Sequence, residues 1–240
     1  EFRRVLFRSG APLCEKFKKE AKKLNVDSIK LILKYIKKKQ KIIYPTTNSG
    51  YGIGEKNKFC DESSSLRPIS LYGTTKAEAE KIALRHKNTI CFRLATVFGY
   101  SYRMRTDLIV NYMVYESIKK KKLLIFEPHF RRNFIHIRDV VAAMVFAINN
   151  FLLLKNNIYN LGLSTANITK YQLAKIIKRK IRDLKVTIQK NKKDPDQRDY
   201  FVSNAKIEKT GYKAKITLER GIEELLGVFK NSKIKFINNY

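Results

Sequence analysis

The chain has no tryptophan and few cysteines, prolines and histidines: 3, 5 and 3 among 240 residues. Its cysteines, Cys14, Cys60 and Cys91, are odd in number and widely spaced, which argues against a disulfide framework and a zinc site. No stretch approaches the roughly 18 apolar residues of a membrane-spanning helix, and the longest candidate, residues 140–154, is interrupted by two asparagines. We therefore expect a cytoplasmic protein with no bound metal and no membrane partner.

Acidic residues are also scarce, because 21 Asp and Glu stand against 51 Lys and Arg and leave a net charge of +30. A basic stripe on one face would indicate nucleic acid, whose phosphates dominate such binding. The lysines are instead spread along the chain, on what we expect to be polar helix faces and helix ends: 16–23, 34–41, 119–122, 175–193 and 230–235. We expect no specific nucleic-acid partner, only a weak attraction for polyanions that salt screens.

What the chain does contain is a regular alternation of helical and strand patterns. The patterns predict helices over 14–24, 26–39, 71–87, 108–119, 140–150, 169–182, 204–210 and 217–231. They predict strands over 41–45, 89–96, 123–126, 132–136, 157–161 and 185–189. Strands separated by helices indicate an α/β fold, in which helices cover both faces of a parallel sheet.

One pair of residues in this layout suggests chemistry. The spacing Tyr-x-x-x-Lys occurs four times in so lysine-rich a chain, and three occurrences are expected to be ordinary helix surface: Tyr35/Lys39, Tyr115/Lys119 and Tyr171/Lys175. The fourth, Tyr72 and Lys76, opens a good helix and follows Thr47 by 25 residues, with a turn-rich loop between them. We therefore single out Thr47, Tyr72 and Lys76 as candidate catalytic residues.

Their chemistry follows from the helical spacing, which places residues four apart on one face. A free phenol has a pKa of about 10 and is a poor base at neutral pH. A neighbouring ammonium favours the phenolate, and a lowering by about two units needs roughly 3 kcal/mol of differential interaction. Thr47 at the end of a strand could hold a substrate oxygen in line. The alternative is an amphipathic helix with a solvated tyrosine and lysine.

With these motifs, residues 11–229 resemble the extended short-chain dehydrogenase/reductases, specifically the NAD-dependent nucleotide-sugar epimerases and dehydratases. The resemblance rests on several separate segments: Tyr44–Gly52, Tyr72–Lys76, Arg93–Gly99, Arg131–Val140, Ile158–Gly162 and Asp196–Asp199. It implies a partial Rossmann-like parallel sheet with helices on both faces, plus a smaller discontinuous substrate lobe. It also implies NAD as cofactor, with NADP not excluded, a nucleoside-diphosphate sugar as substrate, and a homodimer formed through the helices at 26–39 and 71–87.

The resemblance also assigns roles to individual residues. Thr47, Tyr72 and Lys76 would be catalytic. The cofactor would contact Thr46, Tyr72, Lys76, Ala95 and Val97. The substrate would contact Thr96, and its diphosphate would be held by Arg132 and Arg198. Arginine suits the last two positions because its planar guanidinium pairs with phosphate oxygens through two parallel hydrogen bonds.

One family feature is missing, since nothing in the sequence matches the Gly-x-x-Gly-x-x-Gly loop that seats the dinucleotide pyrophosphate. We therefore expect an amino-terminally truncated fragment, inactive as it stands. Residues 1–10 are expected to be an artefactual leader, with a short basic targeting peptide as the alternative. The expected domains are a Rossmann domain (11–100 and 132–154), a substrate lobe (101–131 and 155–230) and a tail (231–240).

The residues after Thr47 bear on the reaction. Dehydratases of this family carry an Asp-Glu pair there, whereas this chain has Asn48 and Ser49, neither of which transfers protons at neutral pH. The resemblance therefore favours an NAD-dependent epimerase, most simply 4-epimerisation as in UDP-glucose 4-epimerases. Thr96 stands where many epimerases have asparagine, so an NAD(P)-dependent nucleotide-sugar reductase or dehydratase of the same family remains an alternative. An alternative of another class is a non-catalytic scaffold that binds a nucleotide or a polyanion.

Two further residues have an open interpretation at this stage. In the wider family an asparagine in the helix at 26–39 supports a proton-relay water, and Asn25 resembles it; an ordinary asparagine at a helix start fits equally well. His136 lies between two isoleucines on a predicted short strand. We expect His136 to be a structural, hydrogen-bonded histidine.

Overall fold

The computed structural model describes residues 10–55, 58–102, 104–189 and 197–231. The predicted leader, apart from Gly10, and the predicted tail, apart from Asn231, lie outside these residues. Asp196, quoted above as part of a motif, also lies outside them.

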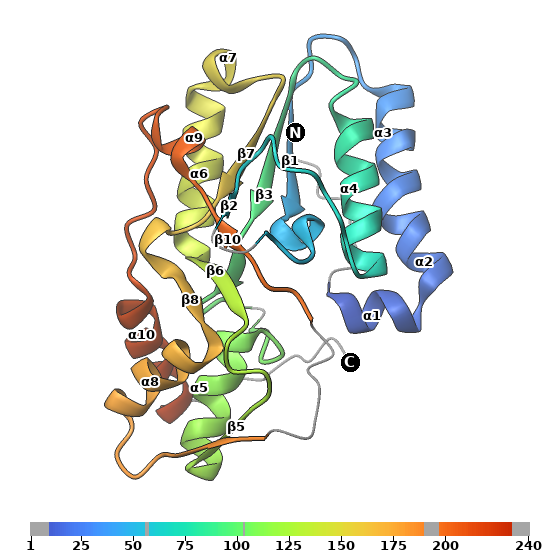
Figure 1. Cartoon of the computed structure of the whole chain (residues 1–240). Helices are drawn as coiled ribbons and strands as arrows, with labels where there is room; N and C mark the ends of the chain where they lie inside the picture. The colour runs from blue at the N-terminus through green and yellow to red at the C-terminus, as the bar shows by residue number, and fades with distance from the viewer. Residues whose placement is uncertain (1–9, 56–57, 103, 190–196, 232–240) are drawn as a thin grey trace.

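The larger part of the molecule is built on a parallel sheet with strand order β1 (Ile42–Thr47), β3 (Thr89–Leu94), β7 (Asn157–Leu161). Helices α3 (Ser28–Tyr35) and α4 (Leu71–Ala83) cover one face, and α6 (Ile137–Asn149) covers the other (Figure 1). This is the predicted Rossmann-like arrangement.

Side-chain alternation along β3 explains why both faces are covered. Ile90 and Phe92 pack in the hydrophobic cluster that includes α6, whereas Cys91 between them packs in the cluster that includes α3 and α4. All three are fully buried. Successive side chains of a strand point to opposite faces, so a continuous apolar run fits a strand covered on both sides.

Strand β7 corrects the predicted domain boundary. The sequence predicts a strand over 157–161, as observed, but the predicted domain boundary places this strand in the substrate lobe. The structure pairs Cys91 with Ile158 and Leu94 with Leu161, so β7 belongs to the sheet of the larger domain. The chain therefore stays in the larger domain from α6 through β7 before it enters the lobe.

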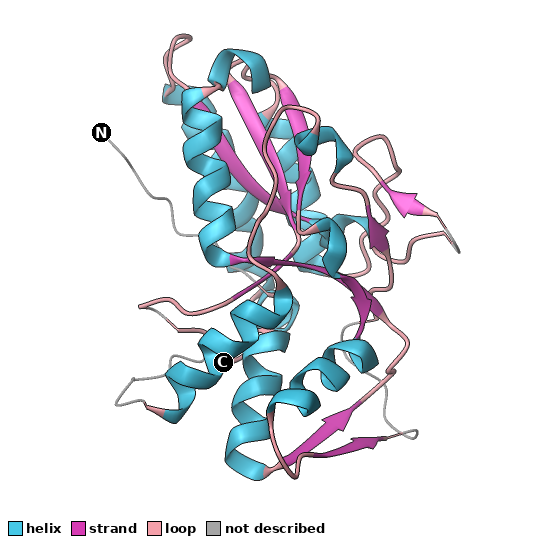
Figure 2. Cartoon of the chain, turned by 90° about the vertical axis from the view of Figure 1, so that its left-hand side faces the viewer, coloured by secondary structure: helices cyan, strands magenta, loops and turns pink. Residues whose placement is uncertain are grey.

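The smaller lobe lies below this sheet in Figures 1 and 2. Its helices are α5 (Ile109–Lys120), α8 (Lys170–Lys180) and α10 (Leu218–Lys230), and they share one core with the parallel ribbon β5 (Lys122–Ile125) and β9 (Lys185–Ile188). A second sheet, with order β4 (Thr96–Phe98), β6 (Arg131–His136), β8 (Asn167–Thr169), joins the lobe to the larger domain.

Several elements differ from their predicted bounds. The first two predicted helices are α1 (Ala11–Lys16), α2 (Lys18–Lys22) and a π-helical turn, η1 (Lys23–Asp27), which leads into α3. The predicted strand 89–96 ends at Leu94, and the chain passes through Ala95 into β4. The remaining short elements are η2 (Asn48–Tyr51), η3 (Ser164–Ala166), β2 (Phe59–Cys60), β10 (Phe201–Val202), α7 (Phe151–Leu154) and α9 (Ala205–Glu208). Among the described helices, none has the length and apolarity to cross a bilayer.

Candidate active site

A cleft of about 380 Å³ lies where β1, β3 and β4 end and the lobe begins. Ligands of open parallel sheets bind at the carboxyl ends of the strands, so this is the expected place for a site. Seven of the nine residues predicted for the site line the cleft: Thr46, Thr47, Tyr72, Ala95, Thr96, Val97 and Arg198. Lys76 and Arg132 do not line it.

Thr47 is the last residue of β1 and caps the short helical turn η2. Its hydroxyl oxygen accepts a hydrogen bond from the Ser49 backbone N–H at 3.1 Å and lies 2.9 Å from Ser49 Oγ. Thr47 also lies close enough to Tyr72 to lower the pKa of the phenol, against the larger effect of burial. The structure therefore brings together the two hydroxyl groups that the sequence placed 25 residues apart.

Tyr72 is the second residue of α4, and the start of this helix is fixed by two caps. Ser70 Oγ accepts from Gly73 N at 3.2 Å, and Glu15 Oε1 on α1 accepts from Leu71 N at 3.1 Å. Gly73 allows α4 to approach η2, because a Cβ at this position would lie 2.9 Å from the Ser49 carbonyl oxygen. The half-buried phenol is thus held at the wall of the cleft.

The electrostatics of Tyr72 differ from the sequence-based hypothesis. Burial raises the pKa of the phenol above its ordinary value, and this outweighs the opposing effects of the nearby Thr47 hydroxyl and the positive charges of Arg198 and Arg105. The groups of this chain alone do not produce the expected lowering, because desolvation disfavours the phenolate more than Thr47, Arg198 and Arg105 favour it.

Lys76 lies one turn further along α4 and is buried. Its Nζ donates to the Pro45 carbonyl oxygen at 2.9 Å and lies 4.9 Å from the centre of the Tyr44 ring. Desolvation lowers the pKa of Lys76 to about 8. The ammonium group therefore touches the backbone of β1, and the arginines named above are the cations that favour the Tyr72 phenolate.

The two predicted diphosphate arginines have different environments. Arg198 lines the cleft, and its guanidinium donates to Ser49 Oγ. Arg132 is buried, lies over the Tyr200 ring at 5.8 Å and donates to the backbone carbonyl groups of Arg131 and Arg198. Arg198 therefore faces the cleft, whereas Arg132 supports the backbone that carries it.

The cleft also presents polar side chains that were not singled out from the sequence, among them Ser49, Arg105 and Asn111. In the sequence, Ser49 stands out only because it replaces a carboxylate that dehydratases of the family carry. Arg105 pairs with Asp107 at 2.5 Å. The amide of the buried Asn111 accepts a hydrogen bond from Gly99 N at 3.1 Å and donates one to the Arg105 carbonyl oxygen at 2.9 Å. No local pattern distinguishes Arg105 in so basic a sequence, because only the fold directs its backbone to the cleft.

The structure shows the environments of Asn25 and His136, for which the sequence left the role open. Asn25 lies in the π-helical turn, fully buried, and its amide donates to Thr75 Oγ1 at 3.1 Å on the turn between Tyr72 and Lys76. His136 is fully buried, and its Nδ1 accepts from Arg138 N at 3.2 Å, which caps α6. His136 is a structural, hydrogen-bonded histidine, as predicted.

Comparison with known proteins identifies the family. The model of the NAD dependent epimerase/dehydratase family matches residues 8–162, more than half of the chain. The chain belongs to the NAD-dependent epimerase/dehydratase family. Its residues Thr47, Tyr72 and Thr96 all lie within the matched range, whereas Arg198 lies beyond it.

Relatives within this family are distant. An uncharacterized protein of Methanocaldococcus jannaschii is 28% identical over 204 residues, which cover 81% of this chain and 60% of that protein. UDP-glucuronate 4-epimerase 4 of Arabidopsis thaliana is 26% identical over 220 residues, covering 81% and 49%. The chain thus spans about half to three-fifths of the length of these curated relatives.

Solved structures of the family share the fold. The UDP-glucose 4-epimerase of Thermotoga maritima, solved with UDP-glucose, superposes with a TM-score of 0.79 at 21% identity. The match covers 94% of this chain and 75% of that one. At this identity the likeness establishes the shared fold alone, and the residues of the cleft must carry any argument about function.

Proposed function

We propose that the full-length protein is an NAD-dependent epimerase of nucleoside-diphosphate sugars, most simply a 4-epimerase like those that act on UDP-glucose. The observation that supports this best is that Thr47 and Tyr72 line one cleft, which also presents Arg198. A hydroxyl, a phenol and a guanidinium in one cleft can position a sugar hydroxyl, take its proton and pair with a phosphate.

In this proposal each side chain has a limited task. Tyr72 accepts the proton of the sugar hydroxyl and returns it at the end of the reaction. Thr47 orients that hydroxyl through its own oxygen. Arg198, already directed into the cleft beside Ser49, pairs with the diphosphate, and Arg132 holds the Arg198 backbone in place. Thr96 at the start of β4 faces the sugar.

The nicotinamide end of a dinucleotide fits the same cleft. Ala95 and Val97 offer small apolar surfaces on its wall, Thr46 lies at the end of β1, and Lys76 is buried within the helix that carries Tyr72. Bound NAD would supply the acceptor for a hydride and return it to the other face of the sugar carbon. The sequence contains no Gly-x-x-Gly-x-x-Gly segment for the pyrophosphate, so we expect NAD to bind this chain weakly.

The side chains of the cleft wall favour epimerisation over dehydration. Among the described residues that line the cleft there is no Asp, Glu or His, so a second acid or base for the removal of water is lacking in this part of the chain. Asn48 is buried off the wall, and Ser49 is bonded to Thr47 and Arg198. A single proton carrier suffices for oxidation and reduction at one carbon.

The test is turnover by the full-length protein with NAD and UDP-glucose, followed by proton NMR of the sugar. We expect interconversion with UDP-galactose and a loss of at least about 100-fold in kcat for Tyr72→Phe, the scale of a lost general base. Tyr171→Phe is the matched control. Tyr171 is exposed, and a lysine follows it one helical turn later, with Lys175 Nζ 4.6 Å from the centre of the Tyr171 ring.

Other outcomes distinguish the alternatives. Consumption of NADPH with a keto sugar, without epimerisation, would indicate a reductase. Tight binding of UDP-glucose with no turnover would indicate a scaffold, and equal turnover by Tyr72→Phe would remove this residue from the mechanism.

We further propose that the protein is a cytoplasmic homodimer. The three cysteines all lie within the described residues, where they are buried and form no disulfide, which suits a reducing compartment. Leu31 and Tyr35 on α3 are 58% and 70% exposed beside α4, an apolar surface that a second copy would cover. Sedimentation equilibrium of the protein and of Leu31→Glu tests this, and a monomeric parent protein would contradict it.

A further inference from the structure

A buried ion pair lies just behind the cleft and outside its wall. Arg93 on β3 and Glu80 on α4 are joined by an N–O distance of 2.7 Å, and Arg93 Nε lies 3.1 Å from both carboxylate oxygens. Their side chains are only 5% and 3% exposed. Burying two charges costs hydration that their attraction often fails to repay, so such a pair is weak evidence of a stabilising role.

The pair holds the two ends of one short segment. Thr46 Oγ1 donates to Glu80 Oε2 at 2.8 Å, and Arg93 donates to the Tyr51 hydroxyl at 3.0 Å. The Tyr51 hydroxyl in turn lies 2.7 Å from Asn160 Oδ1 on β7. The segment between Thr46 and Tyr51 contains Thr47 and Ser49, the residues whose hydroxyl groups reach the cleft.

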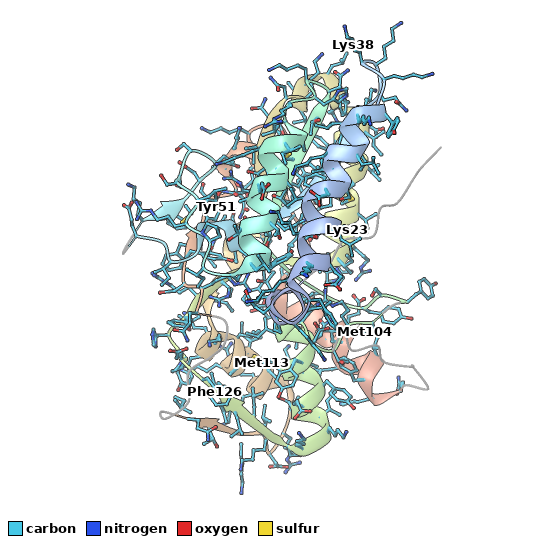
Figure 3. The ribbon with its side chains drawn as sticks, turned by 90° about the vertical axis from the view of Figure 1, so that its right-hand side faces the viewer. Lys23, Lys38, Tyr51, Met104, Met113 and Phe126 are labelled. Atoms are coloured by element: carbon cyan, nitrogen blue, oxygen red, sulfur yellow. The ribbon has the colours of Figure 1, made fainter. Side chains whose placement is uncertain are left out.

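The same pair connects this segment to Tyr72. Glu80 lies on α4 two turns beyond Tyr72, so its carboxylate ties the end of β1 to the helix that carries the phenol. Figure 3, viewed from the side of α3 and α4, labels Tyr51 beside α4. Any shift of this segment relative to α4 would change the geometry of Thr47 and Tyr72.

We propose that Glu80 and Arg93 are positioning residues, which clamp segment 46–51 at both ends and thereby set Thr47 and Ser49 against Tyr72. The inference rests on the proposed epimerase function. Small displacements of reacting groups are costly in catalysis, since an error of about 1 Å can cost on the order of 100-fold in rate. The clamp therefore acts on turnover, whereas a purely structural ion pair would act on stability alone.

The test compares Glu80→Gln with Glu78→Gln, an exposed residue two positions earlier on the same helix. Both changes remove one negative charge and keep the side-chain shape. We expect Glu80→Gln to lower kcat with UDP-glucose at least 10-fold while KM changes less than 3-fold, in protein that remains folded by circular dichroism. Glu78→Gln should match the parent protein.

Tyr51→Phe provides a second variant that loosens the other end of the clamp, and it removes a single hydroxyl. It should show a similar selective loss of kcat, and the double variant should lose less than the product of the two single losses, because the residues act through one network. Unchanged kcat in folded Glu80→Gln and folded Tyr51→Phe would overturn the proposal.

Hydrogen exchange of the backbone amides tests the clamp without an activity measurement. We expect Glu80→Gln to speed exchange within residues 46–51, with no change in α8 or α10, and Glu78→Gln to leave both unchanged. Faster exchange there supports the clamp even if the parent protein has no epimerase activity, a result that would contradict the proposed function alone. Unchanged exchange in 46–51 would overturn the clamp.

Discussion

The ammonium group of Lys76 donates a hydrogen bond to the carbonyl oxygen of Pro45 over 2.9 Å, in a site where the side chain is almost fully buried. This bond joins α4 to β1 immediately before the two cleft-lining threonines. Burial also makes the charge costly, which is why the pKa of Lys76 falls to about 8 from its ordinary 10.5.

The first prediction concerns stability and pH. Between pH 8 and pH 10.5 the unfolded chain holds a proton on Lys76 that the folded chain has released, so the free energy of unfolding should rise with pH. From pH 8 to pH 9.5 this gain should be about 1–2 kcal/mol, less than the full 1.36 kcal/mol for each pH unit because the folded protein still holds half of the Lys76 proton at pH 8. Urea unfolding at several pH values measures this gain as the difference in free energy of unfolding between the parent protein and Lys76→Met. A parallel pH dependence of the two proteins would contradict the prediction.

A second prediction concerns the phenol of Tyr72. Arg105 lowers the pKa of this group against the larger effect of burial, so Arg105→Met should raise it further. If Tyr72 acts as the base, the alkaline rise of kcat/KM should move to higher pH, because the phenolate then forms only at higher pH. Arg179→Met, at an exposed position on α8, is the control. An unshifted pH profile would show that Arg105 does not act on the reacting base.

A third prediction concerns Ser49, whose hydroxyl contacts both Thr47 and Arg198. Ser49→Ala removes the acceptor that directs the Arg198 guanidinium, and we expect binding of UDP-glucose to weaken roughly 5-fold, or about 1 kcal/mol, the usual size of one hydrogen bond. Isothermal calorimetry on the chain measures it, with the exposed Ser65→Ala as control. Equal affinities would mean that Arg198 needs no support from Ser49.

A fourth prediction compares two helical glycines. A Cβ at Gly73 would lie 2.9 Å from the Ser49 carbonyl oxygen, whereas one at Gly227 would have nothing within 4 Å. Gly227→Ala in α10 should stabilise the protein by about 0.5–1 kcal/mol, because alanine favours the helix. Gly73→Ala should destabilise it, because α4 must move away from η2. The midpoints of thermal unfolding of both variants test these two expectations. A stabilised Gly73→Ala would contradict this account of how α4 and η2 pack.

The sequence by itself determined the local structure that carries the site. The range of β7 was predicted as 157–161, as observed, and the helix that begins at Leu71 was predicted with Tyr72 in its first turn. Both follow from short-range rules: β-branched and aromatic residues bounded by asparagines favour a strand, and a serine before a helix caps it. The motifs that include Thr47, Tyr72 and Arg93 also sufficed to indicate the family.

Only the tertiary structure decided which charged groups act on which. Helical spacing allowed Lys76 to lie beside Tyr72, but packing of α4 against β1 directs its ammonium group to Pro45, while Arg198, 149 residues from Ser49, comes to the cleft. The domain of β7 and the pairing of Glu80 with Arg93 were likewise decided by packing. The physical reason is that desolvation and long-range contacts depend on the arrangement of whole elements, which no local pattern contains.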